Sequence, residues 1–224
     1  MLLKVKSTRV NNSILVTRPN HDFPTTYLYF WSELVIDEAK NKDITVLDLD
    51  GKKANKQKFV SYISRNNPRL IFLNGHGSKD SVAGYDNEVL LDEGNCGALL
   101  QEKIIYARSC EAGAKLGSFS IEKGAATFIG YNKDFWLIRS KERGTKPLTD
   151  PIAKLFLEPS NLVPITLIKG NSAQEAYQKS QDDMRRNFSY MISSKASQEE
   201  RDAAFFLFSN YTCQVILGNK QAKI

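Results

Sequence analysis

The chain has 224 residues, of which 42% are hydrophobic and 25% charged, and its formal net charge is +6. These proportions are ordinary for a globular protein. No run approaches the roughly 20 apolar residues that a membrane-spanning helix requires, and residues 1–10 intersperse lysines with apolar residues, unlike a secretory signal. Three irregularly spaced cysteines do not form a disulfide framework and are typical of a reducing cytosol. We therefore expect one cytoplasmic domain spanning residues 1–224.

The positive charge is concentrated in residues 51–69, which contain six basic residues and no acidic one. A basic cluster of this kind is compatible with a nucleic-acid surface. The same stretch also holds Phe59, Tyr62 and Ile63 at helical spacing, and no nucleic-acid-binding motif accompanies the charge. We interpret it as the solvated face of an amphipathic helix and do not expect a nucleic-acid partner.

Apolar runs of strand length alternate with helical patterns over the first 130 residues. Short apolar runs bounded by glycine, proline or asparagine predict buried strands, and apolar residues three or four positions apart predict helices. Such alternation is typical of right-handed βαβ units, and therefore of a mostly parallel sheet covered by helices on both faces. In chain order, the expected elements are strand 13–17, a helix capped by Thr25 or Thr26, strand 44–47, helix 54–65, strand 69–74, a small hairpin at 81–91 with its turn near Asp86 and Asn87, a helical turn at 98–101, strand 103–109, helix 111–122 and strand 125–130.

The last third of the chain is predicted to be helical, with one closing strand. Asp150 followed by Pro151 is a typical helix start, because the aspartate caps the helix and proline suits its first position. Two capping boxes, at 172–175 and 197–200, begin two further helices. A final apolar strand is expected at 212–217.

Two of the predicted core strands end in residues that can carry out chemistry. The first ends at Gly75 and His76, and the next one along the chain ends at Cys110. In an open parallel sheet, ligands bind beyond the carboxyl ends of the strands. If the two strands are neighbours, a histidine base lies beside a cysteine nucleophile. We therefore expect His76 and Cys110 to form a catalytic dyad.

The expected surroundings of Cys110 favour a reactive thiol. A helix at 111–122 would direct its N–H groups and the positive end of its dipole at the sulfur, which stabilises a thiolate. The N–H groups at the start of that helix and the N–H of Gly77 are candidate oxyanion donors. A lone cysteine near a strand is more often part of the core, and this is our interpretation of Cys96 and Cys213.

An apolar strand ending in His-Gly, followed by an apolar strand ending in a small residue and Cys, resembles the signature of the caspase-like (clan CD) cysteine peptidases. These include caspases, metacaspases, gingipains, separase and CHAT domains. The elements over residues 14–130 resemble the three-layer α/β/α caspase-hemoglobinase fold, and the helix start at 170–176 with the terminal strand looks most like CHAT and gingipain-type members. The resemblance implies a cysteine endopeptidase without a cofactor. In it, Cys110 attacks the peptide carbonyl, His76 carries the proton, and the N–H groups of Gly77 and Cys110 bind the oxyanion.

The resemblance also implies where the substrate's P1 side chain binds. The family builds this pocket from three places. The loop after the first strand holds Arg18 and Asp22 here, and the position two before the nucleophile holds Arg108. The loop after the fifth strand holds the region around Trp136. Metacaspases carry an acid where this chain has Arg108. Arg18 and Arg108 together would suit an acidic P1 residue, whereas a free Asp22 would suit a basic one. Asp22 could instead cap the first helix or pair with Arg108. Because Asp22 is the carboxylate in the early loop, Lys or Arg is the expected P1 residue.

A catalytically silent binding or scaffold module on the same fold is the main alternative, because a fold does not dictate activity. A nucleotide-binding protein is a second one, but the turn at 17–20 lacks the glycines that cradle a phosphate. Two histidines and three scattered cysteines offer no metal-ligand spacing, so no metal is expected. The expected partners are a protein or peptide substrate and an activating partner or ligand that orders the loop at 131–147; no membrane partner is expected.

Overall fold

The computed structural model describes residues 12–141 and 146–224; the expectations for residues 1–11 and for 142–145 of the long loop lie outside these ranges. It contains eight named strands and seven α-helices in the described ranges, joined by short 3-10 turns. In chain order they are β1 (Ser13–Arg18), α1 (Phe23–Asn41), β2 (Thr45–Asp50), α2 (Lys56–Asn66), β3 (Leu70–Asn74), β4 (Ser81–Ala83), β5 (Val89–Asp92), α3 (Cys96–Leu99), β6 (Ile104–Arg108), α4 (Leu116–Glu122), β7 (Thr127–Tyr131), α5 (Pro151–Ile168), α6 (Ala173–Met191), α7 (Gln198–Cys213) and β8 (Gln214–Gly218).

A six-stranded sheet with the order β2-β1-β3-β6-β7-β8 forms the centre of the molecule. Its first five strands are parallel, and β8 runs antiparallel to β7 at the edge. The small hairpin of β4 and β5 follows β3, as predicted. The observed order therefore confirms a mostly parallel sheet in which the strands that precede His76 and Cys110 are neighbours.

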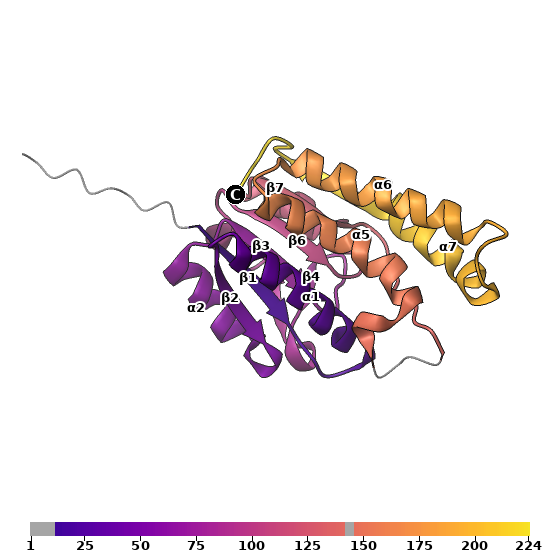
Figure 1. Ribbon diagram of the computed structural model, residues 1–224. Helices are drawn as coiled ribbons and strands as arrows, with labels where there is room; N and C mark the ends of the chain where they lie inside the picture. Colours follow the sequence, from indigo (N-terminus) through magenta and orange to yellow (C-terminus); the bar gives the residue numbers. More distant parts are fainter. Residues whose placement is uncertain (1–11, 142–145) are drawn as a thin grey trace, which may run out of the picture.

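Helices cover both faces of the sheet, which gives the expected α/β/α layers (Figure 1). Along β3, Leu70 and Phe72 join a core cluster with residues of α1 and α5, whereas Ile71 and Leu73 join a second cluster with residues of α2 and α4. Every residue of β3, β6 and β7 is buried. Strands buried on both faces are continuous apolar runs in sequence, which is why they could be predicted.

The three C-terminal helices pack together and extend beyond the end of the sheet (Figure 1). Their starts are those predicted: Asp150 caps α5, and Ser172 and Ser197 form capping boxes at α6 and α7. None of the helices in the described ranges combines the length and apolar character needed to cross a membrane.

The structure corrects the predicted starts of two helices. The cap of α1 is Asp22, and Thr25 is the other member of its capping box. The helix expected directly after Cys110 begins only at Leu116. Glu111 has a φ of +55° and the N–H of Gly113 donates to the Tyr131 carbonyl, so a turn replaces the first part of the expected helix.

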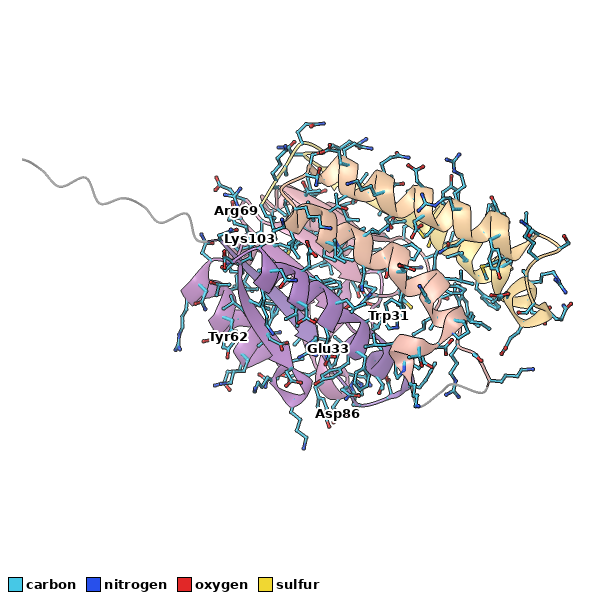
Figure 2. The ribbon with its side chains drawn as sticks, in the orientation of Figure 1. Trp31, Glu33, Tyr62, Arg69, Asp86 and Lys103 are labelled. Atoms are coloured by element: carbon cyan, nitrogen blue, oxygen red, sulfur yellow. The ribbon has the colours of Figure 1, made fainter. Side chains whose placement is uncertain are left out.

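The two ends of the sheet can be told apart in Figure 2. Arg69 and Lys103, which directly precede β3 and β6, lie at one end, and Asp86 of the hairpin lies towards the other. The segments that follow β3 and β6 therefore emerge at the hairpin end, where the carboxyl ends of the parallel strands meet.

Candidate active site

His76 and Cys110 emerge side by side from adjacent strands. Asn74 of β3 is paired in register with Arg108 of β6, and each site residue follows two positions later. Both side chains line a small pocket of about 40 Å³. The remaining lining residues come from the start of α1, the two strand ends and the segment after β7, namely Pro24, Leu28, Gly75, Arg108, Ser109, Phe135 and Leu137. The structure thus brings the two predicted dyad residues together at one pocket.

Glycines let the two strand ends pack backbone against backbone. A Cβ atom on Gly77 would lie 2.5 Å from the Cys110 carbonyl oxygen and 2.8 Å from Cβ of Ser109. Gly75 has a φ of +147°, and a Cβ there would lie 2.1 Å from the Ala83 carbonyl oxygen. Neither position has room for a side chain, which explains why glycine flanks His76 on both sides.

The backbone N–H groups of Gly77 and Cys110 donate no hydrogen bond to any residue that the structure describes. Gly77 forms an isolated bridge with Val82, but the two hydrogen bonds of that bridge run from Ser78 N–H to Ser81 and from Ala83 N–H to His76. Free donors at these positions are what an oxyanion hole requires. The assignment of this role to Gly77 and Cys110 stays a prediction.

The two carboxylate oxygens of Asp22 have different partners. Oδ1 caps α1 by accepting from the Thr25 N–H at 3.0 Å and from the Thr25 hydroxyl at 2.6 Å. Oδ2 lies 2.5 Å from Nε2 of His76. Burial alone would raise the pKa of Asp22, but the hydrogen bonds from Thr25 and His76 outweigh it and hold the pKa at about 2. Asp22 is not among the residues lining the pocket, so its observed role is to hold the histidine rather than to receive a P1 side chain.

The contact with Asp22 also determines which nitrogen of His76 is available. A neutral imidazole carries one proton, and an ionised carboxylate can only accept a hydrogen bond. Nε2 of His76 is therefore the protonated nitrogen, and Nδ1 keeps the lone pair that a base needs.

Arg108 is completely buried, and all five of its N–H donors are used. Nε donates to Asn74, Nη1 to Ser160 and Asn161, and Nη2 to Ser32 and to the Leu28 carbonyl. Burial lowers the pKa of Arg108 to about 10, because no acceptor carries a full charge. Among the described residues, no carboxylate lies within ion-pair distance of it. Asp22 and Arg108 therefore do not form the ion pair that the sequence left open.

Arg18 does not contribute to the pocket. Its guanidinium bonds both oxygens of Asp48, contacts Glu33 and stacks on the Tyr29 ring at 4.3 Å. Arg18 and Arg108 therefore do not act together on an acidic P1 residue, because of the two only Arg108 lines the pocket.

Cys110 lacks the helix N-terminus that was expected to stabilise its thiolate, because α4 begins six residues later. Its Sγ lies 3.8 Å from the Phe135 carbonyl oxygen, a distance suited to a weak S–H hydrogen bond. Burial raises the pKa of the Cys110 thiol, and the negative charges of Asp134 and Glu111 act in the same direction. The sulfur therefore holds its proton more tightly than a free cysteine does. Cys96 and Cys213 are 0% and 2% exposed and belong to the core, as expected.

Trp136 lies beside the pocket, and its two neighbours line it. The Trp136 ring packs against Phe206 at a centroid distance of 4.9 Å. Its backbone N–H and carbonyl are both bonded by the side-chain amide of Asn210, at 2.8 and 2.7 Å. Phe135 and Leu137 form the pocket wall instead. The substrate-binding role expected for Trp136 stays a prediction.

Buried asparagines support the site and were not predicted. Asn74 donates to the Thr17 carbonyl at 2.8 Å and accepts from Arg108 at 2.8 Å, so it joins the ends of β1, β3 and β6. Asn161 of α5 donates to the Trp31 carbonyl and accepts from Arg108. Asn74 ends the apolar run at 70–73, and Asn161 follows Ser160 in a mostly apolar helix; such polar residues must find partners when buried. That was the signal in the sequence.

No protein-family model matches this chain, and no curated protein matches it in sequence. Among solved structures, gingipain R, an Arg-specific cysteine proteinase, superposes with a TM-score of 0.60 at 7% sequence identity. The match covers 96% of this chain and 47% of the gingipain chain, so this chain spans about half the length of that protein. At this identity the match carries the fold alone. The chain shares its mostly parallel α/β fold with gingipain R.

Proposed function

We propose that this chain is a cysteine endopeptidase that hydrolyses peptide bonds with His76 and Cys110. One observation carries the proposal: the two residues follow adjacent parallel strands and line one pocket, on the fold of a cysteine proteinase. The Asp22 carboxylate on Nε2 of His76 adds a third group with a defined role.

The first step is attack by the sulfur. A substrate carbonyl in the pocket displaces the weak contact between Cys110 and the Phe135 carbonyl. Nδ1 of His76 takes the thiol proton, and the resulting imidazolium is stabilised by the Asp22 carboxylate. The sulfur bonds to the carbonyl carbon, and the N–H groups of Gly77 and Cys110 donate to the oxyanion that forms.

The second step releases the two products. The imidazolium of His76 gives its proton to the leaving amine, and the peptide bond breaks to leave a thioester on Cys110. A water molecule, deprotonated by the neutral His76, then hydrolyses the thioester and restores the thiol. Because burial raises the pKa of the thiol, attack by the sulfur depends on His76 to accept the proton.

The charge of the pocket bears on the P1 residue. The expected preference for Lys or Arg depended on Asp22, which is held by Thr25 and His76. Arg108 lies at the pocket with its positive charge unpaired by any described carboxylate, and a basic P1 side chain would approach it without compensation. We therefore propose that the pocket prefers an uncharged or acidic P1 residue, although gingipain R is named for Arg specificity.

A positional-scanning peptide library tests both the activity and the P1 preference. We expect cleavage by the wild-type protein that is lost in Cys110→Ala and kept in Cys96→Ala, a matched control that removes a core thiol. Fastest cleavage after Lys or Arg would refute the P1 proposal alone. The alternative of a silent scaffold module is correct if no peptide is cleaved and an acyloxymethyl ketone does not label Cys110. The activating partner, the cytoplasmic location and the likeness to CHAT domains stay predictions.

A further inference from the structure

The loop between β1 and α1 places a second histidine beside the site. His21 and His76 are separated by 55 positions in sequence, yet their rings meet edge to face at a centroid distance of 6.0 Å. His21 also contacts the Tyr85 ring at 5.3 Å. Its side chain is 11% exposed, and Nε2 lies 3.7 Å from Oδ2 of Asp22.

Both ring nitrogens of His21 are buried and make no hydrogen bond to the described part of the chain. A buried polar atom without a partner is costly, so its presence calls for an explanation such as an additional ligand. His21, Asp22 and His76 each offer one ligand atom, and these three atoms all lie within 4.8 Å of one another. Two imidazoles and one carboxylate are a ligand set that binds zinc.

We propose that His21, Asp22 and His76 form a binding site for a divalent transition-metal ion, with Zn²⁺ as the best fit. Tetrahedral zinc with bonds of roughly 2.0–2.1 Å holds its ligand atoms about 3.3 Å apart. The distances from Oδ2 of Asp22, 2.5 Å to Nε2 of His76 and 3.7 Å to Nε2 of His21, lie on either side of that value. All three ligand atoms lie within 4.8 Å of one another, so modest side-chain shifts would create three ligands, with a water molecule as the fourth.

The metal would act as an inhibitor of the proposed peptidase, and this consequence rests on the proposed function. Zinc on Nε2 of His76 displaces the proton that Asp22 now accepts. The single proton of the neutral ring then resides on Nδ1, which can no longer take a proton from Cys110. The ion thus blocks the base without touching the sulfur.

Calorimetric titration with ZnCl₂ tests the site independently of peptidase activity. We expect one Zn²⁺ per chain in the wild type and in Cys110→Ala, whose thiol the site does not use. The affinity should fall at least about 100-fold in His21→Ala, because loss of even an outer-shell partner costs about 10–100-fold. Tyr85→Phe, which keeps the ring next to His21, is the matched control and should bind as the wild type does. Circular dichroism shows whether each variant is folded, and His21→Gln replaces His21→Ala if the latter is not.

Three results would overturn the proposal: no 1:1 binding by the folded wild type, unchanged affinity in the His21 variants, or loss of binding in Cys110→Ala. The inhibitory role is measured separately, as the ratio of peptide cleavage with and without Zn²⁺ within each variant. The ratio of cleavage with Zn²⁺ to cleavage without it should lie well below one in the wild type and near one in His21→Ala. If no peptide is cleaved by any variant, the proposed function fails while the calorimetry still decides the metal site.

Discussion

Two substitutions at Asp22 separate the stability of helix α1 from the activity of the site, because the two carboxylate oxygens serve different partners. Asp22→Asn keeps an Oδ1 acceptor for Thr25, and asparagine is as good an N-cap as aspartate, so the cap is preserved in this variant. Asp22→Ala loses the same contact with His76 and also removes the cap, so it should be less stable than Asp22→Asn by about 1 kcal/mol. For a chain of this size, that lowers the melting temperature by about 2–4 °C.

Both Asp22 variants lose the charged partner of His76. A hydrogen bond to a charged group contributes about 1.5–3 kcal/mol. The lower value applies here, because the Asp22 and His76 side chains are 34% and 41% exposed. We therefore expect kcat/KM to fall about tenfold in both variants.

Thermal unfolding and cleavage of the best library peptide should be measured on the same preparations of the two Asp22 variants. If Asp22→Asn cleaves at the wild-type rate, the carboxylate does not support the histidine. If the two variants melt together, Oδ1 does not cap the helix. Either result would refute the division of roles between the two oxygens.

Three further predictions concern the thiol, the glycine contact and the buried arginine. Iodoacetamide should label Cys110 faster as the pH rises, and the labelling rate should reach half its maximum at a higher pH than for free cysteine. The reason is that burial raises the pKa of the thiol and only the thiolate reacts. The rate is measured by peptide mass mapping, and a midpoint at or below that of free cysteine would refute the reasoning. In Gly77→Ala, the new Cβ meets the Cys110 carbonyl oxygen, so the free energy of unfolding in urea should fall by about 1–3 kcal/mol and peptide cleavage should slow. In the control Gly97→Ala, the new Cβ meets nothing within 4 Å, so stability and cleavage should not change. Equal effects of the two substitutions would contradict the packing argument. Asn161→Leu leaves one Arg108 donor unpaired and should cost about 1–3 kcal/mol, and an unchanged urea midpoint would show that Arg108 finds another acceptor.

The central strands could be predicted because burial on both faces leaves only apolar residues in them. β3 and β6 are of this kind, and their predicted ends placed His76 and Cys110 correctly at neighbouring strand ends. Local capping signals were equally informative for α5, α6 and α7, because a cap and its helix lie within a few residues of each other.

The features that sequence reasoning missed depend on contacts between distant segments. The start of α4 is delayed because Gly113 bonds to Tyr131 of β7. Asp22 meets His76 across 54 positions, so spacing along the chain could not reveal that the carboxylate is already engaged. The same loop brings His21 to His76, which is why a search for metal-ligand spacing in the sequence found none.

The Asn210 amide that bonds Trp136 has a consequence for the order in which the protein matures. Asn210 follows Cys110 by 100 positions. Strand β7, which precedes Trp136 in the chain, gains its second neighbour in the sheet only when β8 pairs with it. During synthesis on the ribosome, the histidine and the cysteine emerge well before the residues that hold the pocket wall in place. A nascent chain therefore carries His76 and Cys110 before Asn210 can hold the segment around Trp136, and the pocket is complete only after α7 and β8 have folded.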